Sequence, residues 1–152
     1  MKVPNLNGWG KLICPYFAPT CRSILGQYLE DNGFTEIGLN EVGGVRFARL
    51  GIFLEVSYEL EIVPQALNVV IGIGDRKYDA DGHPCCVPYW YFAPSEGSVN
   101  FVTHSKFKTE FELEAVLSTL KNAFLEPCAK RLWTNQGQLE TAIRDFRSKF
   151  DC

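Results

Sequence analysis

The chain has 152 residues, of which 46% are hydrophobic and 22% are charged, and its formal net charge at pH 7 is −3. This length predicts a single domain, residues 1–152, that can bury a core without metals or disulfide bonds. Lysine and arginine are scattered, so no basic field is available for a phosphate backbone and we expect no nucleic-acid partner. No apolar run is long enough for a signal peptide or a membrane span, which predicts a cytoplasmic protein without a membrane partner.

The first eighteen residues predict an irregular arm that packs on the body of the domain. They contain two prolines and two glycines and show no apolar period. Residues 21–29 then place apolar side chains on one face at the spacing of an amphipathic helix. We expect Thr20 to cap this helix and Gly33 to end it.

The middle of the chain predicts a sheet. Alternating or apolar runs of strand length lie at residues 34–42, 45–49, 50–60, 67–74 and 98–103. Gly43-Gly44 predicts a two-residue hairpin turn, and the strict alternation over 50–60 is typical of a strand with one buried face. In the sequence Gly72-Ile73-Gly74 we expect the glycines to make room for a neighbouring side chain or to twist the strand. The order of these strands predicts a meander.

The last third of the chain predicts helices. Thr109 with Glu112 fits a capping box, Asn135 with Gln138 repeats that pattern, and Pro127 between them starts or kinks a helix. The fold class is therefore α+β. We expect a twisted, mainly antiparallel sheet of about five strands, with the N-terminal helix and two to three C-terminal helices packed on one face.

Any functional site is expected in residues 75–94, where a charged loop meets a cysteine pair and an aromatic run. His83, Cys85 and Cys86 are residue types that bind Zn²⁺, with a fourth ligand available from Cys128, Asp81 or His104. A cysteine nucleophile would need His83 or His104 as its base. We favour the alternative in which His83 ends a surface turn and both cysteines enter a buried strand as small hydrophobic residues.

The remaining acidic residues and cysteines give weaker indications of a functional site. All six cysteines are expected to be free thiols, because the chain has an ample core and no export signal. Asp79 and Asp81 precede Gly82, but the spacing of a calcium loop is absent, so a solvated turn is favoured.

An acidic and aromatic surface is the candidate binding site. Glu55 and Glu59 lie on the open face of the predicted 50–60 strand, where carboxylates are most often a solvated sheet face. If residues 89–92 are extended, their rings alternate between two faces, and those on the second face need a cover or a partner. The residues predicted to bind a partner are Glu55, Glu59, Asp79, Asp81, Tyr89, Trp90 and Tyr91.

The order of the elements resembles a loose class of small bacterial α+β proteins. The features that carry the resemblance are Asn32-Gly33-Phe34 at the end of the first helix, Phe53-Leu54-Glu55-Val56-Ser57-Tyr58 in a long strand, Ile71-Gly72-Ile73-Gly74, the segment Val87-Pro88-Tyr89-Trp90-Tyr91, and two capped C-terminal helices. Members of this class have unknown functions, and some are suspected immunity proteins for polymorphic toxins.

The sequence leaves three hypotheses about function. The first is a non-enzymatic protein-binding module without a cofactor, of which an immunity-like neutraliser of a toxin is one form. The second is an enzyme or metal protein that uses His83, Cys85, Cys86 and His104. The third is a domain that binds a small ligand in a pocket lined by aromatic side chains.

Overall fold

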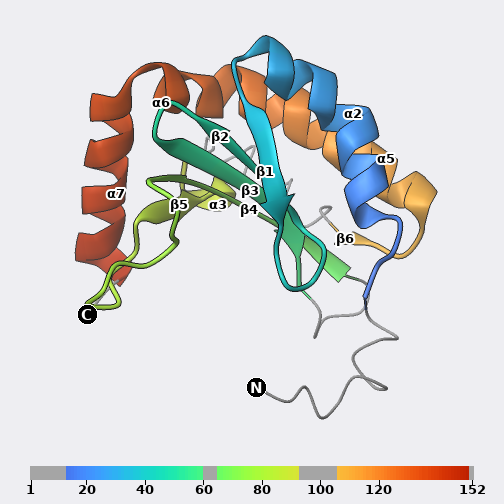
Figure 1. Cartoon of the computed structure of the whole chain (residues 1–152), viewed down its shortest axis with the longest axis horizontal. Helices are drawn as coiled ribbons and strands as arrows, with labels where there is room; N and C mark the ends of the chain where they lie inside the picture. Colours follow the sequence, from blue (N-terminus) through green and yellow to red (C-terminus); the bar gives the residue numbers. More distant parts are fainter. Residues whose placement is uncertain (1–12, 60–64, 93–105, 151–152) are drawn as a thin grey trace.

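The fold is an antiparallel sheet covered by helices in a computed structural model that describes residues 13–59, 65–92 and 106–150 (Figure 1). Helix α2 (Phe17–Asp31) precedes the strands, which run in the order β1-β2-β3-β4-β5 with every neighbouring pair antiparallel. Their bounds are Thr35–Leu39, Val45–Arg49, Ile52–Tyr58, Gln65–Ile73 and Cys86–Pro88, and β6 (Lys106–Phe107) pairs with the start of β4. The α+β meander is confirmed; the expected strand at 98–103 lies outside the described residues.

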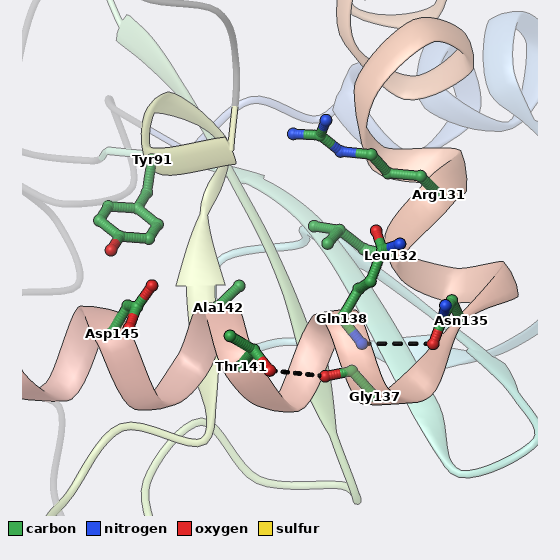
Figure 2. Close-up of a pocket in the computed structure, with 9 residues that line it drawn as sticks. All are labelled: Tyr91, Arg131, Leu132, Asn135, Gly137, Gln138, Thr141, Ala142 and Asp145. Atoms are coloured by element: carbon green, nitrogen blue, oxygen red, sulfur yellow. Dashed lines mark hydrogen bonds between the residues drawn. The ribbon is translucent and has the colours of Figure 1, made fainter.

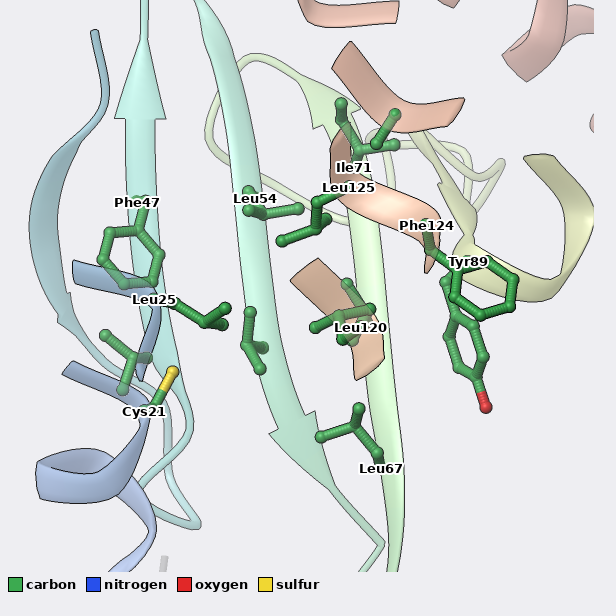
Figure 3. Packing of buried hydrophobic residues seen from close by; sticks show 14 of the residues in the cluster. Cys21, Leu25, Phe47, Leu54, Leu67, Ile71, Tyr89, Leu120, Phe124 and Leu125 are labelled. Carbon is green, nitrogen blue, oxygen red and sulfur yellow. The ribbon is translucent and has the colours of Figure 1, made fainter. Parts of the chain in front are cut away.

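The helices pack on one face of the sheet, as expected. Helices α5 (Glu110–Thr119), α6 (Lys130–Thr134) and α7 (Gln136–Phe150) follow the strands, with α5 and α6 joined by the π-helical stretch η1 (Leu120–Ala129). Figure 3 shows the resulting core, in which side chains of α2 and η1 meet the side chains of β2, β3 and β4. Buried aliphatic and aromatic side chains from every layer form this cluster, so apolar burial fixes the layers.

Helix α2 begins earlier than expected. It starts at Phe17, and Thr20, the expected cap, is buried in its first turns. The reason is burial: Phe17 is fully buried in the core, which draws the preceding segment onto the sheet. The expected end is confirmed, since Gly33 adopts a φ of 85° and its N–H bonds to the Glu30 carbonyl.

The β1–β2 connection is longer than the predicted two-residue turn. It runs over residues 40–44, and only Gly43 of the glycine pair has a positive φ. The side chain of Asn40 closes this loop, because its Oδ1 accepts hydrogen bonds from the N–H groups of Val42 and Gly44 at 3.0 and 2.7 Å.

Strand β3 is buried on both faces, so the prediction of one buried face is wrong. All seven of its residues are buried, including Glu55 and Ser57. Leu54 and Val56 face the helices, whereas Phe53 joins Val70 and Cys86 in a second cluster on the opposite face. When the second face of a central strand is covered, the polar residues that alternate with the apolar ones are buried as well.

The aromatic run does not continue strand β5. Residues Tyr89–Phe92 form the single turn α3, so the run is not extended and its rings do not alternate between sheet faces. Tyr89 is buried against Phe124 at a ring-centroid distance of 6.3 Å, whereas 41% of the Trp90 surface is exposed.

The C-terminal helix starts are confirmed. The Thr109 hydroxyl accepts a hydrogen bond from the Glu112 N–H at 3.1 Å, and Asn135 Oδ1 accepts one from the Gln138 N–H at 3.3 Å. Pro127 lies inside η1, where the helix winds in wider turns and continues into α6. Proline supplies no N–H for an α-helical bond, which fits this local change of winding.

A Gly72→Ala substitution is expected to destabilise the fold by about 2 kcal/mol through overpacking. A methyl group at Gly72 would lie 2.6 Å from the Cys85 carbonyl oxygen and 2.6 Å from the Phe53 ring. The expectation that this glycine makes room for a neighbour is therefore confirmed. Urea denaturation measures the free energy of unfolding.

Gly26→Ala is the matched control for this prediction. A methyl group at Gly26, inside α2, meets nothing within 4 Å, so the change is expected to stabilise the protein by roughly 1 kcal/mol through helix propensity. Equal effects of the two substitutions on the free energy of unfolding would contradict the packing argument.

Candidate functional site

Glu55 is a buried carboxylate held by two cations. Its side chain is 4% exposed, and its two oxygens lie 3.2 Å from Arg46 Nε and 2.5 Å from Lys77 Nζ. The Arg46 guanidinium also stacks over the Phe53 ring, 4.9 Å from its centroid. A charge withdrawn from water requires such pairing. The prediction that Glu55 contributes to a solvated binding surface is therefore wrong, and its position is structural.

The same two cations fasten the β4–β5 loop (residues 74–85) to the sheet. Arg46 Nη2 donates a hydrogen bond to the Asp75 carbonyl at 2.9 Å, and Lys77 reaches Glu55 from within the loop. The Lys77 carbonyl accepts the Cys85 N–H at 2.7 Å, and Tyr78 forms an antiparallel bridge with Pro84. The base of the loop is thereby held over the second face of the sheet.

Asp79 shapes the tip of the β4–β5 loop. Its Oδ1 accepts hydrogen bonds from the N–H groups of Asp81 and His83 at 2.9 and 3.0 Å, and Gly82 takes a φ of 84°. These N–H donors, first that of His83, lower the pKa of the Asp79 carboxyl below its usual value. The favoured interpretation of this segment as a turn is confirmed, with Asp81 and His83 exposed on it.

Arg147 connects the β4–β5 loop to α7. Its Nε donates a hydrogen bond to the Pro84 carbonyl at 2.5 Å. Its Nη2 lies 3.4 Å from Asp79 Oδ2 and 3.7 Å from Cys85 Sγ. In Figure 1 the loop lies beside the C-terminal turns of α7. No sequence signal marks Arg147, because its contact joins segments more than sixty residues apart.

The adjacent cysteines do not act together. Cys85 lines an open pocket of about 530 Å³ with Ile73 and Arg147, beside the helix-covered face. The Cys86 thiol instead lies near the Lys77 carbonyl at 3.8 Å and packs in the second cluster. Their side chains therefore point to different faces of the sheet. Within the described ranges no three His, Cys, Asp or Glu side chains converge as metal ligands, and His104 lies outside those ranges.

Burial favours the protonated form of the four buried thiols in the described part of the chain. Burial raises the pKa of Cys21 to about 12 and that of Cys86 to about 11, and it also raises the pKa values of Cys14 and Cys128. A protonated thiol is a poor nucleophile and a poor metal ligand. All five described cysteines are free, as expected, and Cys85 is the half-buried one.

A pocket of about 510 Å³ lies between α3, α6 and α7 (Figure 2). We call it the α7 pocket. Its lining residues are Tyr91, Arg131, Leu132, Asn135, Gly137, Gln138, Thr141, Ala142 and Asp145. Figure 2 shows Asp145 below the Tyr91 ring, and the Arg131 guanidinium extending from α6 towards α3. The pocket therefore has a carboxylate and an aromatic ring on one side and a guanidinium on another.

Aromatic contacts fix the Tyr91 side of the α7 pocket. The Phe146 ring lies 5.3 Å from the Tyr91 ring and 6.0 Å from the Trp90 ring, and Lys149 Nζ lies 5.7 Å from the Tyr91 ring. Such edge contacts hold flat rings in place at a surface. Trp90 is thus an exposed ring beside the pocket.

The structure separates the seven predicted binding residues. Glu55 and Tyr89 are buried, Asp79 and Asp81 lie on the β4–β5 loop, and Glu59 is exposed after β3. Of the seven, only Tyr91 lines the α7 pocket, and Trp90 is its neighbour in the chain. Arg131 and the polar stripe of α7 are not among the predicted residues, although Gln138, Thr141 and Asp145 recur at helical spacing and follow a correctly predicted cap.

The sequence matches no protein-family model, and comparison with curated proteins and with solved structures also returns no match. Among the residues that the structure describes, no helix has both the length and the apolar character needed to cross a bilayer.

Among the described cysteines of the native protein we expect iodoacetamide to alkylate the half-buried Cys85 first, and to alkylate Cys86 about 100-fold more slowly than an ordinary thiol. A pKa of about 11 instead of 9.0 lowers the thiolate fraction of Cys86 by that factor near neutral pH. Timed alkylation followed by mass spectrometry measures both rates. The variants Cys85→Ser and Cys86→Ser assign the modified residue, since both lie in one proteolytic fragment. Equal rates at the two positions before unfolding would contradict the burial of Cys86.

Proposed function

We propose that the chain is a non-enzymatic protein-binding module and that the α7 pocket with Trp90 is its contact surface. The observation that carries this proposal is that residue types typical of protein interfaces occur together at one exposed pocket. An aromatic ring, a guanidinium and a carboxylate line the open α7 pocket, and a partly exposed tryptophan stands beside it. Trp, Tyr and Arg are the residue types that most often dominate the energy of protein interfaces.

The chemistry of the described residues favours binding over catalysis. Four thiols have raised pKa values, the vicinal cysteines face apart, and the one buried carboxylate is neutralised by two cations. None of these groups has the activated state that a nucleophile or a general base requires. The α7 pocket is also open at the surface, as an interface is, and no polar groups are buried deep inside it to orient a small substrate.

The charges of the α7 pocket suit a partner segment of mixed charge. A basic side chain of the partner is expected at Asp145, whose carboxylate lines the pocket and attracts a cation. An acidic side chain fits at Arg131, which can hold a carboxylate with two parallel hydrogen bonds. The resemblance to suspected immunity proteins makes a toxin the first class of partner to test.

The variants Trp90→Ala and Arg131→Glu are expected to weaken binding of a toxin-like protein encoded beside this chain's gene by at least about tenfold. Each removes an interface anchor, and the loss is equivalent to about 1.4 kcal/mol or more. Isothermal titration calorimetry with the purified partner measures the affinity. Circular dichroism melting confirms that each variant is folded.

Phe111→Ala is the matched control, because Phe111 is an aromatic residue that is 80% exposed on α5, away from the α7 pocket. Its effect on the affinity is expected to stay within twofold. Binding that tolerates both α7-pocket variants, or that depends on Phe111 instead, would contradict the proposed surface. The absence of any complex with the encoded neighbour would contradict the immunity-like form of the proposal.

A further inference from the structure

A second depression lies on the other side of the fold, between α2 and the edge strand β1. We call it the α2–β1 groove. It encloses about 370 Å³ and is lined by Arg22, Gly26, Glu30, Phe34, Thr35, Glu36 and Phe47. It shares no residue with the α7 pocket. Phe34 and Phe47 are themselves almost fully buried, so their ring edges form an apolar floor that lies below a charged rim.

Within the described part of the chain, strand β1 is an open edge of the sheet. It pairs with β2 on one side, and on the other side no described residue hydrogen-bonds to its backbone. All five of its residues are exposed, and Ile37 and Leu39 show 51% and 53% of their surface. A row of unpaired N–H and C=O groups beside exposed apolar side chains is what an incoming strand recognises.

The bulge in β1 limits how long a strand can pair with the open edge, but it does not remove that edge. The register shifts between Glu36 and Gly38, so one residue of β1 has no partner on β2. A bulge increases local twist and discourages long, flat edge-to-edge pairing. A short extended peptide is therefore favoured over a whole strand of another sheet.

Gly26 keeps the α2–β1 groove open. It lies inside α2, and a methyl group built on it would meet nothing within 4 Å. Its φ is not in the positive range, so neither packing nor backbone conformation requires a glycine there. Glycine inside a helix lowers helix stability. Gly26 therefore leaves space beside β1 that a larger side chain would occupy.

The rim of the groove carries an excess of negative charge. Arg22 is fully engaged, because its Nε and Nη2 each donate a hydrogen bond of 2.8 Å to the Glu36 carboxylate. Glu30, which also lines the groove, has no ion-pair partner among the described residues. An unpaired carboxylate beside a neutralised pair attracts a basic side chain.

We propose that the α2–β1 groove binds an extended segment of a partner protein, which adds a short strand to β1 and places a Lys or Arg side chain against Glu30. Alternate side chains of that segment enter the groove above Phe34 and Phe47. A second copy of this chain is disfavoured as the occupant, because residues 35–39 carry Glu36 and no basic residue. This proposal does not rest on the function proposed for the α7 pocket.

Selection of a phage-displayed library of random octapeptides on the immobilised full chain tests this proposal. The enriched peptides are expected to alternate apolar residues and to contain a Lys or Arg. Fluorescence anisotropy of a labelled synthetic version then measures affinity. Gly26→Leu, which fills the groove, and Glu30→Lys are each expected to weaken binding at least tenfold. Hydrogen exchange of the β1 amides is expected to slow when the peptide is bound.

Ser23→Leu is the matched control, since it adds the same side chain to an exposed position of α2 outside the groove. It is expected to leave the affinity unchanged, and thermal melting shows that all variants are folded. Peptides that bind Gly26→Leu as tightly as the native chain would overturn the proposal, and so would enriched peptides without a basic residue. A dimer that forms through β1 in sedimentation experiments would overturn the assignment of the occupant.

Discussion

The buried carboxylate of Glu55 is the constraint on which the rest of the architecture depends. It lies at the centre of β3, a strand covered on both faces, where an ionised group is stable only if opposite charges surround it. Arg46 supplies one charge from β2 and Lys77 supplies the other from the β4–β5 loop. A single acidic residue thus requires a loop more than twenty residues later in the sequence to fold back over the sheet.

That loop in turn determines where α7 lies. Asp79 and Pro84 of this loop accept hydrogen bonds from Arg147, which lies in the last turns of α7. Phe146, one residue before Arg147, contacts the rings of Trp90 and Tyr91. The segment from Asp75 to Tyr91 therefore holds α7 from two sides. The α7 pocket lies along this helix, so its shape follows indirectly from the charge buried at Glu55. The α2–β1 groove has a different origin, since it depends on a glycine and an open sheet edge.

The sequence predicted the fold better than the site, for physical reasons that differ between residues. Period-two alternation, the Thr109 and Asn135 caps and Gly33 are local signals, and the elements they predicted are present. Whether a second sheet face is covered depends on distant residues such as Lys77, so period-two alternation alone predicts a solvated Glu55 where the structure has a buried one. Tyr89, predicted to bind a partner, is buried instead, because Pro88 is followed by a helical turn rather than by more strand. The helical spacing of Asp145 places it on one face of α7, but only the packing of α6 and α7 brings it to the same pocket as Arg131.

Hydrogen exchange of a Glu55→Gln variant tests most directly whether the buried charge positions the site. The substitution keeps the size of the side chain and removes the charge that binds Lys77 and Arg46. The account predicts faster exchange of amides in residues 75–86 and in the last turns of α7, with α2 unchanged. Glu59→Gln, at an exposed position just after the same strand, is predicted to exchange like the native protein. Native exchange in the β4–β5 loop and in α7 of the Glu55→Gln variant would contradict the account.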